Sequence, residues 1–296
     1  YYLKEQKEKQ IQQIQKINLS DDDHFNNIRC YTAILKNFGS RFWTKKNNPI
    51  KVIDLSMLTF SLYSVEHEFF NAIIMYSSDL LTEEQKNQIK EIDLYELLIN
   101  RKLKEAFIAI IDKFGSQLSK EQEKQLSKIE LSVYIKSENE LDKKVLLAIT
   151  KHCYQKMSAN QKAKILGMDL NSRIKNQNSV DKEIFELIMV EHYDELSEEQ
   201  KNKIQIDEID LGVYIESENE LDRKFLRNVI KHGRLTRRQK VSILNMDLNN
   251  LITSKYDVDR EIFGLITSKL HHELDNKQFL AIKKLDTKTF VLLIQN

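Results

Sequence analysis

The stretch Leu196-Ser-Glu-Glu-Gln-Lys-Asn-Lys-Ile204 decides the fold. It predicts the start of a helix, and its pattern recurs at other positions of the chain. A serine followed three residues later by a glutamine forms a capping box. The hydroxyl accepts a backbone N–H of the first turn, and the glutamine reaches back to the serine backbone. The preceding apolar residue can pack against the first turn. We therefore expect a short helix to begin after Ser197.

This capping motif, an apolar residue followed by Ser, Thr or Asp and then by Gln, occurs six times. The steps between successive first residues are 37, 39, 39, 39 and 39. A fixed period of this length is typical of repeat proteins in which neighbouring units stack. The six copies begin at Leu81, Leu118, Met157, Leu196, Leu235 and Leu274.

Four of the six capping motifs lead into an apolar-Asp-Leu corner, such as Ile209-Asp210-Leu211, whereas the corner after the second copy reads Ile129-Glu130-Leu131. A longer amphipathic helix, such as Glu183–His192, then follows. The corner Asp can cap the next turn of helix. A row of carboxylates that lines a groove is the alternative. The apolar residues of the longer segment form the wide stripe of a core-facing helix. Each unit of about 39 residues is thus expected to contain two helices and a turn.

Two segments 80 residues apart are nearly identical. Val133–Asp142 reads VYIKSENELD and Val213–Asp222 reads VYIESENELD, so that only Lys136 and Glu216 differ. This similarity indicates that the units are arranged in pairs.

Within the second copy we expect Val213 and Ile215 to face the core, and Asn219 and Asp222 to form the turn and the start of the next helix. We expect Lys136 and its counterpart Glu216 to face solvent. If the segment binds a partner, that mismatch and the two tyrosines, Tyr134 and Tyr214, are the candidate residues.

The composition favours an all-α fold, because 296 residues contain one proline and six glycines. Antiparallel sandwiches and doubly wound sheets need more turn residues than this. The fold we expect is a right-handed α-solenoid of about six two-helix repeats over residues 51–296, as one elongated domain. Residues 1–50 are expected to be an N-terminal helical cap or a linker from a preceding domain.

This pattern resembles the helical-repeat solenoids as a class, which includes the armadillo, HEAT, tetratricopeptide and ankyrin arrays. The resemblance covers about residues 52–296 and is architectural, because the Thr-Pro-Leu-His and Trp-Leu-Gly motifs of those arrays are absent. It implies an extended surface for protein binding, and it transfers no functional residues.

Sequence signatures of catalysis are missing. No phosphate-binding glycine loop and no GxSxG elbow occurs. His67-Glu68 begins like a zinc-protease helix, but the second histidine would be residue 71, which is Asn71. We therefore predict no catalytic residues, no metal ligands and no cofactor, and we favour a non-enzymatic role.

The net charge of +1 argues against nucleic-acid binding, which depends on an excess of basic residues. Two cysteines, Cys30 and Cys153, form no CxxC motif and favour a reducing compartment. No signal peptide or transmembrane segment is evident. We expect a cytoplasmic protein, or one delivered into a host cytosol. The chain opens on Tyr1 instead of Met, so we expect further chain at both ends.

Two equivalent segments carry opposite charge. Glu191–Gln200 contains five acidic residues, and Lys231–Lys240 contains five basic ones. One interpretation is lateral ion pairing between stacked units, with Glu198 and Glu199 beside Arg237 and Arg238. The other is a basic binding site for an acidic peptide, a phosphate or an anionic lipid. The candidate residues are Arg234, Arg237, Arg238 and Lys240.

The function that these observations favour is a protein–protein interaction scaffold, as a segment of a larger multidomain protein such as a secreted bacterial effector. Its partner would be a protein, acidic or phosphorylated at the contact. One alternative is a helical regulatory domain that promotes nucleotide exchange on a small GTPase. A second is nucleic-acid binding along a basic groove.

Overall fold

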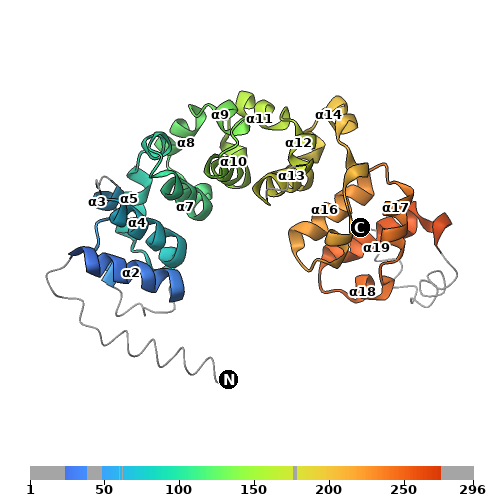
Figure 1. Ribbon diagram of the computed structural model, residues 1–296, viewed down its shortest axis with the longest axis horizontal. Helices are drawn as coiled ribbons and strands as arrows, with labels where there is room; N and C mark the ends of the chain where they lie inside the picture. The colour runs from blue at the N-terminus through green and yellow to red at the C-terminus, as the bar shows by residue number, and fades with distance from the viewer. Residues whose placement is uncertain (1–23, 39–48, 60, 62, 176–178, 275–296) are drawn as a thin grey trace, which may run out of the picture. The chain divides into compact units, whose positions relative to one another are not determined.

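The computed structural model describes residues 24–38, 49–59, 61, 63–175 and 179–274. Every regular element in these ranges is an α-helix or a 3-10 helix, which confirms the all-α fold class for this part of the chain (Figure 1). The chain divides into two compact units, unit 1 (Tyr1–Ile165) and unit 2 (Leu166–Asn296). None of the described helices is long and apolar enough to cross a lipid bilayer.

The helices of unit 1 are α2 (His24–Phe38), α3 (Leu55–Thr59), α4 (Ser64–Ser77), α5 (Glu83–Glu91), α6 (Leu94–Ile99), α7 (Lys104–Phe114), α8 (Lys120–Ser127), α9 (Leu131–Ile135), α10 (Glu140–Cys153) and α11 (Ala159–Leu166), whose last residue opens unit 2. Those of unit 2 are α12 (Leu170–Lys175), α13 (Ser179–Glu191), α14 (Glu198–Lys203), α15 (Gly212–Glu216), α16 (Glu220–His232), α17 (Arg237–Leu244), α18 (Leu248–Thr253) and α19 (Asp257–Lys269). Single 3-10 turns are η2 (Pro49–Val52), η3 (Ser78–Leu80), η4 (Gly115–Gln117), η5 (Tyr154–Lys156), η6 (Tyr193–Glu195), η7 (Ile206–Glu208) and η8 (His271–Glu273).

The short helices begin where the capping motif predicts. Complete capping boxes stand before α5, α8, α14 and α17. Ser158 and Gln161 form the same pair of bonds before α11. The sixth motif, at Asp275, lies outside the described residues, as do Tyr1–Lys16, Trp43 and the residues after Leu274.

The motif glutamines have a second role that the sequence did not indicate. The side-chain amide of Gln122 donates to the carbonyl oxygens of Ile89 (2.8 Å) and Ile92 (3.2 Å), which end the preceding short helix. Gln85, Gln161 and Gln239 each make the same two bonds to residues 30–35 positions upstream. Gln200 makes one such bond. Each glutamine therefore starts its own helix and also closes the end of the preceding one.

The corner acids cap the following helices, as expected. Asp93 accepts the backbone N–H groups of Tyr95 and Glu96, and Asp169 holds the start of α12 in the same way. At the corner Ile129-Glu130-Leu131, glutamate replaces aspartate, and Glu130 still accepts the backbone N–H of Ser132. These carboxylates are used by the backbone, which explains their regular spacing without a functional acid array.

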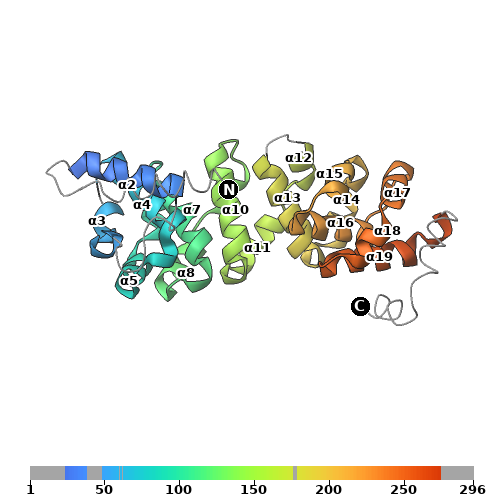
Figure 2. The same ribbon diagram turned by 90° about the horizontal axis from the view of Figure 1, so that it is seen from below.

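The longer helices pack side by side within each unit. In unit 1, α2 packs on α4, α4 on α7 and α7 on α10; in unit 2, α13 packs on α16 and α16 on α19 (Figure 2). Aromatic residues fill these contacts, and Phe107 of α7 and Phe225 of α16 are fully buried. Burying one such side chain contributes about 1.5–3 kcal/mol. Short helices form the remaining layer of each unit.

The expectation that Val213 faces the core is wrong. Val213 is 58% exposed and Val133, its counterpart, is 61% exposed. The segment is one turn of helix, so the residue that shares a face with buried Leu211 is Tyr214, three positions on. Lys136 and Glu216 are both exposed, as expected.

Candidate functional site

The basic segment of unit 2 is presented by a tight connection between α16 and α17. Gly233 ends α16, and its N–H donates to the carbonyl oxygen of Val229 at 2.7 Å. A β-carbon at this position would lie 2.5 Å from that oxygen, so only glycine fits. Thr236 then caps α17, which places Arg237 and Arg238 in the first turn of that helix.

Three of the four basic residues predicted to bind a partner are exposed and have no ion-pair partner among the described residues. The guanidinium groups of Arg234, Arg237 and Arg238 make no ion pair or hydrogen bond within the described ranges. Lys240 differs, because its ammonium group lies 2.6 Å from Glu273 Oε1. We call Arg234, Arg237 and Arg238 the arginine surface.

The acidic segment of unit 2 does not neutralise the arginine surface. Glu198 pairs with Lys201 at 2.9 Å and Glu199 with Lys203 at 2.5 Å, both within α14. No ion pair joins these two glutamates to Arg237 or Arg238 in the part of the chain that the structure describes. Glu198 and Glu199 therefore have partners within α14, whereas the three arginines have no ion-pair partner in the described residues.

His232 lies beside the arginine surface at the end of α16. Its ring packs on the ring of Tyr193, with 4.4 Å between centroids. Burial, and next the charge of Lys231, lower the pKa of His232, although Asp194 opposes the shift. The imidazole is consequently neutral at pH 7, so the positive charge of this surface comes from its arginine and lysine residues.

The two candidate tyrosines occupy different environments. Tyr214 is buried, and its hydroxyl donates to Glu186 Oε1 at 2.6 Å. Tyr134 is half-buried, and its hydroxyl makes no hydrogen bond within the described residues. Tyr214 is thus inside unit 2 and does not present its hydroxyl to a partner.

The difference follows from one residue of the preceding long helix. Lys104-Glu-Ala-Phe-Ile-Ala-Ile-Ile111 aligns with Lys182-Glu-Ile-Phe-Glu-Leu-Ile-Met189, so that Ile108 occupies the position of Glu186. The lysine that opens each segment lies over the tyrosine ring, at 5.6 Å from the Tyr134 centroid and at 4.8 Å from that of Tyr214. Comparing these two helices would have revealed Glu186 from the sequence.

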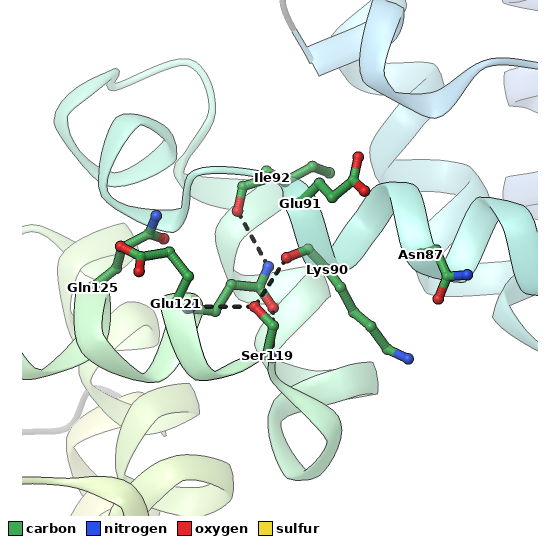
Figure 3. Close-up of a pocket in the computed structure, with 8 residues that line it drawn as sticks. Asn87, Lys90, Glu91, Ile92, Ser119, Glu121 and Gln125 are labelled. Atoms are coloured by element: carbon green, nitrogen blue, oxygen red, sulfur yellow. Dashed lines mark hydrogen bonds between the residues drawn. The ribbon is translucent and has the colours of Figure 1, made fainter.

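Two cavities in the described residues are candidate ligand sites, and one of them borders a candidate tyrosine. The larger, of about 570 Å³, lies between α5 and α8 (Figure 3). Ser119 donates to the carbonyl oxygen of Lys90 there, and the carboxylates of Glu91 and Glu121 lie on opposite sides. The side chains therefore do not converge on a ligand. The smaller cavity, of about 270 Å³, borders Tyr214.

The histidines and cysteines of the described residues do not form a metal-binding cluster, and Cys153 is buried. No group of three or more His, Cys, Asp or Glu side chains gathers there to hold a metal ion. His67 Nε2 is engaged by the carbonyl oxygen of Ser61 at 2.8 Å. Burial raises the pKa of Cys153 to about 12, so its thiol stays protonated and unreactive.

Comparison with known proteins gives no relative: no protein-family model, no curated protein and no solved structure matches the chain.

Proposed function

We propose that this chain is a right-handed α-solenoid of about six two-helix repeats, similar in architecture to the helical-repeat solenoids, and that it acts as a non-enzymatic scaffold for a partner protein. The motif glutamines support this arrangement, because each one bonds its own repeat to the preceding repeat. Stacked units of this kind bury their apolar stripes against each other and present long surfaces to partners.

The arginine surface is the proposed contact, and its three exposed guanidinium groups, which have no ion pair within the described part of the chain, carry the proposal. An arginine without an internal carboxylate is available to a partner without first breaking an ion pair. Guanidinium groups bind carboxylates and phosphates with two parallel hydrogen bonds, each charge-assisted bond contributing about 1.5–3 kcal/mol. The proposed partner segment is therefore acidic or phosphorylated.

Fluorescence anisotropy with a defined probe tests this function. The probe is a short fluorescein-labelled peptide rich in glutamate with one phosphoserine, and its control peptide carries glutamine and serine instead. The full chain is compared with the triple variant Arg234→Glu, Arg237→Glu, Arg238→Glu. We expect the affinity for the acidic peptide to fall at least about tenfold, which is ~1.4 kcal/mol.

A second triple variant controls for overall charge. Lys120→Glu and Lys124→Glu on α8, together with Lys128→Glu at its C-cap, change the net charge by the same amount at exposed positions. This variant should bind the acidic peptide as the unmodified chain does. The proposal is contradicted if both triple variants bind the acidic peptide equally weakly. It is also contradicted if the unmodified chain binds the neutral peptide as tightly as the acidic one. Tighter binding of a single-stranded oligonucleotide of equal charge would favour nucleic acid instead.

A further inference from the structure

Unit 1 exposes apolar side chains on two of its short helices. Tyr95 and Ile99 of α6 are 46% and 60% exposed, and Val133 of α9 is exposed to a similar extent. Tyr95 and Ile99 are four positions apart, so their side chains are neighbours on one face of α6. Single exposed apolar residues are ordinary on a protein surface, whereas a group of them marks an interaction site.

Tyr134 connects the two helices. It follows Val133 in α9, and the centroid of its half-buried ring lies 5.6 Å from the Lys104 ammonium nitrogen at the start of α7. Burial, and next the charges of Asp142 and Tyr95, raise the pKa of Tyr134, so the phenol groups of α6 and α9 lie within electrostatic range of each other. The apolar surface of unit 1 consists of Tyr95, Ile99, Val133 and Tyr134.

The hydroxyl group of Tyr134 gives this surface a polar group to offer. It makes no hydrogen bond within the described residues, whereas the equivalent hydroxyl of Tyr214 donates to Glu186. Buried and partly buried polar groups of folded proteins normally have a hydrogen-bond partner. An acceptor from another molecule would therefore find a donor already in place.

Basic residues border the apolar surface. Lys136 lies one turn after Val133 at the end of α9, and Arg101 and Lys102 follow α6. All three bases are exposed and have no ion-pair partner among the described residues. Of the acids in these segments, only Glu96 lacks a partner in the part of the chain that the structure describes, so available positive charge exceeds negative charge here. The other carboxylates are engaged by backbone N–H groups in the case of Asp93, and by ammonium groups in the case of Glu130, Glu138 and Asp142.

We propose that the apolar surface of unit 1 binds a segment of a partner protein whose apolar side chains are flanked by acidic ones. The apolar side chains of this segment would cover Tyr95, Ile99 and Val133 and remove their exposed area from water. Its carboxylates would accept hydrogen bonds from the bordering bases and from the Tyr134 hydroxyl. Such charges orient a partner and speed its association. The inference does not rest on the arginine surface, because it uses residues of unit 1.

The equivalent helices of unit 2 carry a different set of side chains. Leu94–Ile99 of α6 aligns with Leu170–Lys175, so that an asparagine and a lysine replace the exposed tyrosine and isoleucine. The counterpart of Tyr134 is buried in unit 2 and bonded to a carboxylate. Exposed Val213, the counterpart of Val133, therefore provides an internal comparison for the binding experiment.

NMR of the full chain with labelled Ile and Val methyl groups tests the proposal directly. The probe is a short peptide in which pairs of leucines are separated by pairs of glutamates. One comparison peptide has serine in place of leucine, and the other has lysine in place of glutamate. We expect the probe to shift the methyl signals of Ile99 and Val133 in a saturable manner and to leave that of Val213 in place. Both comparison peptides should bind at least about tenfold more weakly.

Two double variants separate the apolar contribution from the charged one. Tyr95→Asn with Ile99→Gln removes apolar area at exposed positions, and Arg101→Glu with Lys136→Glu reverses the charge of the border. We expect each double variant to weaken binding of the probe at least about fivefold, as read from the Val133 signal.

A third double variant controls for net charge. Lys113→Glu with Lys151→Glu makes the same charge change at exposed positions in the last turns of α7 and α10. Each of these lysines lies roughly 13 Å along its helix from Lys104 or Asp142, which is longer than the Debye length at physiological salt. This variant should bind the probe within about twofold of the unmodified chain. If it weakens binding as much as the charge reversal at the border does, the local contact is refuted.

Several results would overturn the proposal. Equal binding of the serine peptide would show that apolar side chains are not recognised, and equal binding of the lysine peptide would show that acidic ones are not. If neither Ile99 nor Val133 responds to the probe, the surface does not bind such a segment. Loss of these two signals with phosphatidylserine vesicles, without a response to the probe, would assign the surface to a membrane. The triple arginine-surface variant should still show the Val133 shift, so failure of one proposal is distinguishable from failure of the other.

Discussion

The hydroxyl of Tyr214 donates a hydrogen bond of 2.6 Å to the buried carboxylate of Glu186. Tyr134, in an almost identical segment, has Ile108 at the aligned position of the preceding long helix. Two segments that share nine of ten residues therefore lie in different environments, because the residue on the preceding long helix differs. Testable outcomes are expected for this contact, for the long-range hydrogen bonds of the motif glutamines and for the connection at Gly233.

Tyr214→Phe should destabilise unit 2 by about 2 kcal/mol, because it removes a hydrogen bond to a buried carboxylate and leaves that carboxylate short of a donor. Urea unfolding followed by circular dichroism measures the change. Tyr134→Phe is the matched control and should cost less than ~0.5 kcal/mol, since its hydroxyl has no such partner. Equal costs for both substitutions would mean that the Tyr214–Glu186 bond contributes nothing specific.

Glu186→Gln should change the dependence of stability on pH. Burial raises the pKa of the Glu186 carboxyl above its ordinary value of 4.5. As pH rises past 4.5, the unfolded chain releases this proton before the folded chain does, so the folded state loses stability through that window. The glutamine variant keeps an acceptor for Tyr214 and lacks the titration.

Urea unfolding at pH 4 and pH 7 provides the measurement. The stability of Glu186→Gln relative to the unmodified chain should increase from pH 4 to pH 7. Glu183→Gln removes an exposed carboxylate one turn away on α13 and serves as the comparison variant. A relative stability that stays constant across this range would rule out the buried, uncharged state of Glu186 at low pH.

Gln239→Ala should destabilise unit 2 more than Gln200→Ala. The Gln239 amide is 4% exposed and donates to the carbonyl oxygens of Ile206 (2.8 Å) and Ile209 (2.9 Å). Gln200 is half-buried and donates to one carbonyl oxygen. Because both glutamines complete a capping box, the difference isolates the hydrogen bonds from the glutamine side chain to the upstream carbonyl oxygens.

We expect Gln239→Ala to lower the free energy of unfolding by about 2–4 kcal/mol and Gln200→Ala to lower it by about 1–2 kcal/mol, as measured by urea unfolding. If the two variants lose the same stability, helix capping accounts for both losses. The long-range bonds to the upstream carbonyl oxygens then contribute no measurable stability.

Gly233→Ala should cost about 2–3 kcal/mol, because its β-carbon would lie 2.5 Å from the Val229 carbonyl oxygen and 3.2 Å from Ile206 Cγ2. Gly212→Ala is the comparison, since the nearest atom there is Asp210 Oδ1 at 3.3 Å, on a side chain that can shift. It should change stability by less than ~1 kcal/mol. Thermal unfolding of both variants checks the order, and a more stable Gly233→Ala protein would contradict the close approach.

The sequence by itself determined where the short helices begin and which acids start the next helix. These features depend on contacts within a few residues, such as those between Thr82 and Gln85 or between Asp93 and Tyr95. A local hydrogen bond needs only the right residue types at the right spacing. For the same reason the period and the all-α class could be predicted.

Only the tertiary structure decided which charges are paired and which side chains are buried. Glu198 could have met Arg237, but Lys201 of its own helix is closer in sequence and holds it at 2.9 Å. Tyr214 is buried, and Val213 exposed, because their one-turn helix faces α13 and α16. The side-chain amides of Gln122 and Gln239 donate to carbonyl oxygens 30–33 positions upstream, a separation that no local pattern encodes. Long-range contacts depend on how whole helices pack, and that packing is set by the combined burial of many side chains instead of by any one motif.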